Sequence, residues 1–339
     1  PWQNAASPLI EGELLFVNCN APSRRLLALR PTDGSVVWQG QDDKMTQATP
    51  VAATLQGVRQ ILFMAQSGLV AVAPETGSVL WRYKFPYSVS TGASPVVAGD
   101  IVYCSAAYNI GAAAVRVTKS GNLWSVRELW RKPGELMNHW STPVHHNGYL
   151  YGLYGHGAHG VAPLQCVNLL TGEEMWSQEG FGPGGVLLVD GLIMVLSDAG
   201  TLVLVQPDPT AYTEVARFKA LTGKCWNVPA VCNGRIYARS TKEGVALEVP
   251  PPPLPALRLS PPQRQPDGSW RLQIACADGS PIDAPRAARI EVRATTNVAA
   301  PLTDWVQPST PLALTNGTLR LEQPAAGSPA QRYFIVLER

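Results

Sequence analysis

Charged side chains are scarce in this sequence. Asp, Glu, Lys and Arg together make up 15% of its 339 residues, and the formal net charge is only +2. Proteins that bind nucleic acid or acidic lipid concentrate positive charge on one surface, so we expect neither as a partner. No apolar run reaches the roughly 18 residues of a membrane-spanning helix, so no membrane span is expected either.

The sequence also lacks the short motifs of familiar catalytic and metal centres. It has no Gly-x-Ser-x-Gly elbow, no His-Glu-x-x-His and no phosphate-binding loop. Its six cysteines include no Cys-x-x-Cys and no adjacent pair, which gives zinc sites and thiol–disulfide motifs little support. Most of them lie in apolar stretches and are expected to be small buried hydrophobes. Cys225 and Cys232 are close enough in sequence to be tested as a disulfide.

One sequence motif recurs along the first half of the chain. An apolar strand leads into a polar turn, and a second strand ends on tryptophan, with glycine four residues before that tryptophan. Three clear copies and a looser fourth are present: 27–38, 71–81, 166–176 and 114–130. Glycine accepts the positive φ of a tight hairpin turn. The indole, which buries about 150–250 Å², is then able to lie over the neighbouring repeat.

A second marker, a proline that opens a strand, precedes each tryptophan. Successive prolines are 42, 45, 48 and 86 residues apart, the last step being two repeats: Pro8, Pro50, Pro95, Pro143 and Pro229. Self-similarity at this period, with four strands per unit, predicts an all-β fold of β-propeller blades. Six units are visible: 1–38, 48–81, 93–130, 141–176, 183–218 and 227–249. The fifth has Phe218 in place of tryptophan, and the sixth has three strands, so we expect an intact protein of seven or eight blades.

These two markers resemble the repeat of PQQ-like (pyrroloquinoline-quinone-type) β-propellers, over residues 1–249. That family includes periplasmic quinoprotein dehydrogenases and non-enzymatic scaffolds such as the outer-membrane assembly lipoprotein BamB. The resemblance implies a periplasmic or secreted protein and tryptophan docking between blades. It also implies that an enzymatic member would hold pyrroloquinoline quinone beside calcium, bound by Glu, Asn and Asp. No such acidic set is evident, since the acidic residues lie mostly in hairpin turns.

The composition of the sequence changes after Val249. A proline-rich segment, 250–256, is predicted to be a stiff linker. Residues 257–339 contain short alternating strands and an Asn316-Gly317 hairpin signal, which predict a small β-sandwich similar to fibronectin-type-III modules.

Candidate site residues gather on one face of the predicted propeller. In a four-stranded blade, the link into the first strand and the hairpin between strands two and three emerge at the same end. His139, His156 and His159 would share that end and are the candidate metal ligands. With aromatic and amide neighbours they form the candidate ligand face: Asn138, His139, Trp140, His156, His159, Trp226 and Asn227. The competing interpretation is that the tryptophans brace one blade against the next.

The function predicted from these features is a non-catalytic binding or scaffold module, with a protein or a small-molecule or carbohydrate ligand at the funnel face. The alternative is an oxidoreductase of the alcohol or sugar dehydrogenase type that uses pyrroloquinoline quinone and calcium. An exposed blade edge that takes up a strand from a partner is a further mode of binding.

Overall fold

The computed structural model describes residues 5–21, 24–40, 43–155, 161–249, 253–324 and 332–338. The chain divides into two compact units, Pro1–Pro250 and Pro251–Arg339, and each is considered by itself. The described part of the chain contains no helix with the length and apolarity needed to cross a bilayer.

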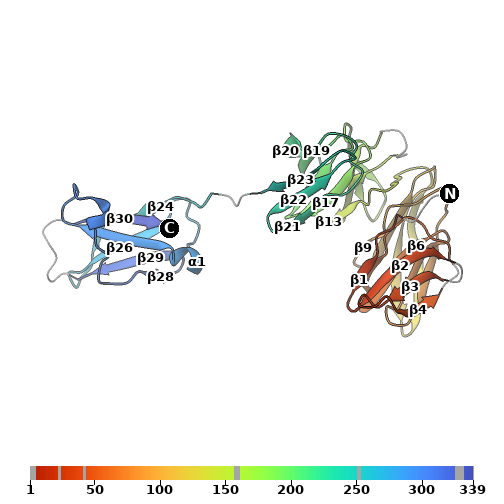
Figure 1. Cartoon of the computed structure of the whole chain (residues 1–339), viewed down its shortest axis with the longest axis horizontal. Helices are drawn as coiled ribbons and strands as arrows, with labels where there is room; N and C mark the ends of the chain where they lie inside the picture. Colours follow the sequence, from red (N-terminus) through yellow and green to blue (C-terminus); the bar gives the residue numbers. More distant parts are fainter. Residues whose placement is uncertain are drawn as a thin grey trace. The chain divides into compact units, whose positions relative to one another are not determined.

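The first unit is a series of antiparallel sheets in chain order, drawn from red to green in Figure 1. Five sheets have four strands and the sixth has three, so the predicted propeller blades and the short sixth unit are confirmed. The strands of the first three sheets are β1 (Leu9–Glu11), β2 (Leu14–Ala21), β3 (Arg24–Leu29), β4 (Val36–Gly40), β5 (Val51–Leu55), β6 (Val58–Ala65), β7 (Gly68–Val72), β8 (Val79–Lys84), β9 (Val96–Ala98), β10 (Ile101–Ala106), β11 (Gly111–Ser120) and β12 (Leu123–Lys132). Those of the other three are β13 (Val144–His146), β14 (Tyr149–Leu153), β15 (Leu164–Asn168), β16 (Glu174–Gln178), β17 (Gly185–Val189), β18 (Leu192–Leu196), β19 (Thr201–Gln206), β20 (Thr213–Lys219), β21 (Ala230–Cys232), β22 (Arg235–Arg239) and β23 (Gly244–Glu248).

Each sheet packs face to face on the next one along the chain. In β6, Ile61 and Phe63 pack toward the first sheet, whereas Leu62 and Met64 pack toward the third. A strand covered on both faces must be apolar on both, and β6 is therefore a continuous apolar run rather than an alternating one. The same arrangement gives shared clusters at the following seams, around Tyr103 with Leu150, Tyr151 with Val186, and Met194 with Ile236.

The repeated tryptophans lie at these seams. The indole N–H of Trp38 donates to the carbonyl of Pro74 at 2.7 Å, and that of Trp130 donates to the carbonyl of Leu169 at 2.9 Å. In both cases the acceptor lies in the hairpin between strands three and four of the next sheet. Trp176 makes the corresponding bond to Asp208 at 2.8 Å.

Glycine is required in the hairpins beneath two of these indoles. Gly77 has φ +68°, and a Cβ placed on it would lie 2.5 Å from the ring of Trp38. Gly172 has φ +69°, and its Cβ would lie 2.7 Å from the ring of Trp130. A side chain at either position would meet both backbone strain and a steric clash. At these two seams, the tryptophan of one repeat therefore packs directly on the hairpin glycine of the next repeat.

Two positions depart from this pattern. Trp81 is buried, but its N–H donates within its own sheet to the Gln60 side chain at 2.7 Å. Phe218, which occupies the tryptophan position of the fifth repeat, is 47% exposed. The seam between the fifth and sixth sheets is instead filled by aliphatic residues and Cys225.

The Ser/Thr-Pro marker has a separate structural role. The backbone N–H of Ser7 donates to the Thr49 hydroxyl at 3.0 Å, and the N–H of Ser94 donates to the Thr142 hydroxyl at 2.9 Å. In each pair, the residue before one proline is bonded to the residue before the next. The hydroxyl therefore links the starts of successive sheets, and the proline holds the strand entry extended.

The cysteines form no disulfide among the described residues. Cys104, Cys166, Cys225 and Cys276 are buried, as expected for small apolar residues, whereas Cys232 is exposed. Cys225 and Cys232 are not bonded to each other.

The second unit contains two antiparallel sheets around one core that includes Leu272, Ile274, Val292 and Leu321. Its assignment as a fibronectin-III-like sandwich stays a prediction. The predicted linker ends within this unit, because the carbonyl of Ala256 accepts from the N–H of Ala277 at 2.7 Å. The elements are β24 (Leu257–Leu259), β25 (Gln263–Arg264), β26 (Trp270–Cys276), α1 (Ala284–Ala287), β27 (Ile290–Thr295), η1 (Leu302–Asp304), β28 (Ala313–Thr315), β29 (Thr318–Gln323) and β30 (Tyr333–Glu338).

A buried arginine ties the ends of the second unit together. The Arg286 guanidinium makes two 2.9 Å bonds to the Glu338 carboxylate and a 2.6 Å bond to the carbonyl of Pro255. These bonds connect α1 with the last strand and with the linker. The hydrogen bonds from Arg286 hold the pKa of Glu338 below its ordinary value of 4.5.

This ion pair predicts acid sensitivity of the second unit. A carboxylate with a depressed folded-state pKa contributes stability that is full above the unfolded-state pKa and is lost as the pH falls through the folded-state value. We expect the unfolding midpoint of this unit to decline below a pH of about 4.5, and Glu338→Gln to reduce that decline. Thermal unfolding followed across acidic pH checks this. Equal pH dependence in the wild type and the variant would contradict it.

Candidate functional site

Four aromatic rings form a continuous series across the predicted ligand face. The ring centroids of Tyr108 and His139 are 5.0 Å apart, those of His139 and Trp140 are 4.3 Å apart, and those of Trp140 and Trp226 are 4.6 Å apart. We call Tyr108, His139, Trp140 and Trp226 the aromatic ladder. Its members come from the β10–β11 hairpin and from the links that lead into β13 and β21, so the structure brings together residues far apart in sequence.

The centre of the ladder is held by backbone contacts. The carbonyl of His139 accepts from the N–H groups of Gly92 at 2.8 Å and Ala93 at 3.0 Å. A Cβ at Gly92 would lie 3.1 Å from both His139 and Trp140, so the close approach of these two links favours glycine. Trp140 also donates its indole N–H to the carbonyl of Pro183 at 3.0 Å. Trp140 therefore connects the entry of the fourth sheet with the link into the fifth, and its ring also contacts the rings of His139 and Trp226.

Tyr108, the first residue of the ladder, has an unusual backbone conformation. Tyr108 and Asn109 have φ values of +57° and +61°, the left-handed region that non-glycine residues seldom occupy. Such conformations cost free energy and gather at functional sites. At the next ring, the Ser90 hydroxyl lies 3.0 Å from Nε2 of His139.

Asn138 takes part in the fold beneath the ladder. It is fully buried. Its side-chain oxygen accepts from the Tyr103 hydroxyl at 2.7 Å, and its side-chain nitrogen donates to the carbonyl of Leu153 at 2.9 Å. Its backbone N–H donates to the Ser105 hydroxyl at 2.8 Å. Asn138 therefore joins the third and fourth sheets and positions His139, while its own amide is engaged inside the protein.

The last ring of the ladder is open to solvent. Trp226 is 43% exposed, and the Lys224 ammonium lies 4.6 Å from its ring centroid. Asn227 follows at the edge of a hollow of 470 Å³ that is also lined by Val228, Tyr237 and Arg239. The accessible part of the predicted site is thus an indole with a cation on its face, beside a shallow hollow.

Two of the predicted site residues, His156 and His159, lie outside the described residues. The metal site on His139, His156 and His159 therefore stays a prediction. Over the described ranges, no group of three or more His, Cys, Asp or Glu residues is placed to hold a metal ion.

The described residues of this face do not fit calcium beside a quinone. Calcium takes six to eight oxygen ligands. The Asn138 amide is already engaged, and the charged group next to the exposed indole is a lysine. Asp198, in the hairpin between strands two and three of the fifth sheet, has its pKa raised by burial, with Lys224 nearby opposing the shift. In the described part of the chain, Asp198 belongs to no group of three or more His, Cys, Asp or Glu residues that could hold a metal ion.

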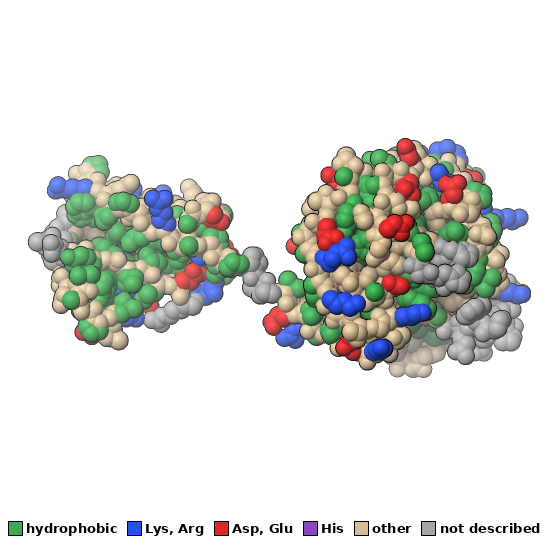
Figure 2. All heavy atoms as spheres, turned by 90° about the horizontal axis from the view of Figure 1, so that it is seen from above, with side chains coloured by type: hydrophobic (Ala, Val, Ile, Leu, Met, Phe, Trp, Pro, Cys, Tyr) green, Lys and Arg blue, Asp and Glu red, His purple; other side chains and the backbone are tan. Residues whose placement is uncertain are grey.

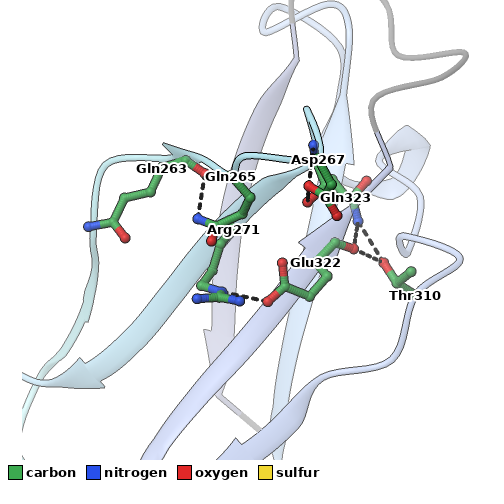
Figure 3. A network of polar contacts seen from close by, with 8 residues as sticks. Gln263, Gln265, Asp267, Arg271, Thr310, Glu322 and Gln323 are labelled. Carbon is green, nitrogen blue, oxygen red and sulfur yellow. Dashed lines mark hydrogen bonds and ion pairs between the residues drawn. The ribbon is translucent and has the colours of Figure 1, made fainter.

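The second unit has a polar hollow that the sequence patterns did not indicate. It measures 630 Å³ and is lined by residues of β26 and β29 and of their flanking turns. Figure 3 shows its side chains bonded to one another: Arg271 donates to Glu322 at 2.5 Å and Gln323 donates to Thr310 at 2.8 Å. The signal available in the sequence is the polar alternation of Trp270–Cys276, which also describes an ordinary solvated strand face.

The fold and the repeat contacts define the first unit as a β-propeller, and its repeats resemble those of PQQ-like propellers. A family model described as outer membrane protein assembly factor BamB matches residues 2–152. The solved structure of BamB from Moraxella catarrhalis is similar with a TM-score of 0.53 and 19% identity, covering 72% of this chain and 69% of that one. A europium-containing methanol dehydrogenase is similar with a TM-score of 0.45 and 12% identity, covering 78% of this chain and 62% of that one. No curated protein matches the sequence.

Proposed function

We propose that the propeller unit is a non-catalytic, periplasmic or secreted scaffold that binds a protein partner at the exposed end of the aromatic ladder. The observation that carries this proposal is the half-exposed indole of Trp226, which contacts Trp140 at a tilt of 39° and is faced by Lys224. A rigid, partly exposed tryptophan supplies a large contact area at little entropic cost and is typical of binding hot spots.

The charge at the ladder indicates the kind of segment that would bind. Lys224 is the cation beside Trp226, so an extended segment with an acidic group next to an apolar or aromatic side chain would satisfy both. Figure 2 shows Lys and Arg interspersed with Asp and Glu on the face of the first unit that it presents.

The remaining parts of the proposal follow from the repeats. We infer that the indole-to-hairpin contacts act as tryptophan docking, which makes the sheets a stiff platform for the ladder. The similarity to an outer membrane protein assembly factor supports a periplasmic scaffold whose partner belongs to outer-membrane protein assembly. The second unit would then be a separate β module joined by residues 250–256.

In-cell photo-crosslinking tests this function. A photoreactive residue replaces Val228 in one variant and Leu123 in the other, so that Trp226 itself is kept. Val228 is 45% exposed and lines the hollow that begins at Asn227, whereas Leu123 is 79% exposed at the start of β12, at the opposite end of the strands. We expect a discrete protein adduct from position 228 and none from position 123. Equal labelling at both positions, or none at 228, would contradict the proposal.

The dehydrogenase alternative has its own test. Purified protein is titrated with pyrroloquinoline quinone and Ca²⁺ while the visible spectrum and dye-linked oxidation of alcohols and sugars are followed. We expect no stoichiometric quinone band and no dye reduction, because the described residues of the face do not supply a calcium cage. A stoichiometric band with oxidation of an alcohol or sugar would replace the scaffold function with an enzymatic one.

A further inference from the structure

In the second unit, the edge of β27 that faces away from β30 is only partly covered. At that edge, the N–H of Ala294 donates to the carbonyl of Val306 at 2.8 Å, and the N–H of Val306 donates back at 3.0 Å. Backbone groups alternate in direction along a strand, and the pairing of β27 with β30 has no register shift. The N–H and C=O groups of Val292 and Ile290 therefore point to the same edge. Among the described residues, no hydrogen bond reaches these four groups.

Pro308 stops the neighbouring segment from completing this edge. Val306 lies opposite Ala294, so a continued antiparallel pairing would place residue 308 opposite Val292. That position must donate an N–H to the ladder, and proline has none. The segment instead leaves the edge, and the Thr310 hydroxyl donates to a backbone carbonyl of β29 in the other sheet at 2.5 Å.

A hollow lies where the missing strand would run. It has a volume of 460 Å³, within the range of ligand-binding pockets, and one side of it is formed by residues 288–292. The other side is formed by residues 307, 308 and 310–312, and the core residue Leu321 also lines it. A polypeptide backbone in this hollow would reach the four open groups, as when a strand is added to a sheet edge.

The side chains at this edge describe the segment that would bind. Ile290 and Val292 are buried in the core of the unit, so residues opposite them would also point toward the core. The Arg289 side chain is 51% exposed, and its guanidinium is 3.9 Å from the Glu338 carboxylate. An acidic side chain opposite Arg289 would complement this exposed charge.

We propose that β27 takes up an extended segment of a partner polypeptide as an added antiparallel strand. The segment has apolar side chains opposite Val292 and Ile290 and an acidic side chain opposite Arg289. A second copy of this chain fits less well. The register in which two β27 strands use all their open groups places Glu291 opposite Glu291, and like charges at such positions destabilise a strand pair.

A short peptide tests this on the full chain. The probe is acetyl-Thr-Val-Thr-Val-Asp-Thr-amide, whose valines lie opposite Val292 and Ile290 and whose aspartate lies opposite Arg289 in antiparallel pairing. A nuclear magnetic resonance titration of the isotope-labelled chain should show saturable binding and slower hydrogen exchange at the amides of Val292 and Ile290. The amides of Glu291 and Arg293 face β30 and should exchange slowly with or without peptide.

N-methylated peptides separate strand pairing from apolar contact. Methylation of the first valine N–H, which points toward β27, should weaken binding about 10-fold, the effect of one lost hydrogen bond. Methylation of the central threonine, whose N–H points away from β27, is the matched control and should change binding little. No saturable binding by the parent peptide, or equal affinities of the two methylated peptides, would overturn the proposal.

A lysine peptide tests the charge at the edge. We expect the chain to bind the aspartate peptide about 3-fold more tightly than the same peptide with lysine in place of aspartate. Arg289→Gln should abolish this preference and leave the unfolding midpoint nearly unchanged, because the side chain is half exposed. A preference that survives in the variant would overturn the role of Arg289.

Light scattering of the chain without peptide distinguishes a second copy as the occupant. We expect no self-association through this edge. Self-association that the aspartate peptide abolishes would show that a second copy pairs with β27, and would overturn the choice of partner.

Discussion

Gly77→Ala is expected to destabilise the first unit far more than Gly34→Ala. Both glycines have a φ near +70° in hairpins with the same hydrogen bonds, so both substitutions carry the left-handed strain of about 1–2 kcal/mol. At Gly77 the new Cβ would also lie 2.5 Å from the Trp38 ring. Displacing a buried indole adds a cost that approaches the roughly 3–5 kcal/mol of a tryptophan-to-alanine change.

Urea unfolding of the two variants, followed by a probe in the first unit, measures this difference. Gly34→Ala is the matched control, because it shares the backbone conformation but no described residue lies within 4 Å of a Cβ placed there. Gly172→Ala, beneath Trp130, should resemble Gly77→Ala. Equal losses of stability at Gly34 and Gly77 would show that the indole contact contributes nothing beyond the turn.

Asn138→Ala is expected to lower the stability of the first unit, whereas Trp226→Ala is expected to weaken partner binding. Loss of the Asn138 side chain leaves the carbonyl of Leu153 without its buried donor and the Tyr103 hydroxyl with only the longer 3.2 Å bond to the Leu136 carbonyl, which costs about 3 kcal/mol of unfolding free energy. Trp226→Ala removes a half-exposed ring, so its stability should change by only about 0.5 kcal/mol. Its binding to the protein crosslinked at position 228 should weaken about 30-fold, as for a hot-spot tryptophan.

Chemical unfolding and binding titrations of the two variants check this contrast. Tyr103→Phe serves as a control for Asn138, because it removes the same hydrogen bond from the other side. A stable Asn138→Ala variant would contradict the structural role given to that amide. Unchanged binding by Trp226→Ala would move the binding surface away from the ladder.

The propeller could be predicted from the sequence because its markers are local. A glycine that needs a positive φ lies four residues before a tryptophan, and a Ser/Thr-Pro step opens each of the first four sheets. The sheet boundaries and the three-stranded sixth sheet then follow from the spacing. The partner of each indole did not follow, because Trp81 bonds to Gln60 in its own sheet and Phe218 remains exposed.

The site was less predictable, because burial decides which of its residues face a ligand. Asn138, His139 and Trp140 are consecutive in sequence. The side chain of Asn138 is nevertheless buried beneath the ladder, while the rings of the other two belong to it. The link to Trp226 depends on chain segments more than eighty residues apart in sequence. No periodic pattern encodes such a contact. The buried Arg286–Glu338 pair of the second unit is another long-range contact that composition alone does not reveal.

The account rests on the contact between an indole of one sheet and the hairpin glycine of the next, and a double-mutant cycle on Trp38 and Gly77 measures it directly. If the contact exists, the cost of Gly77→Ala should fall in a Trp38→Ala background to that of Gly34→Ala, a coupling of about 3 kcal/mol. Costs that simply add, with Gly77→Ala equally damaging in both backgrounds, would contradict it.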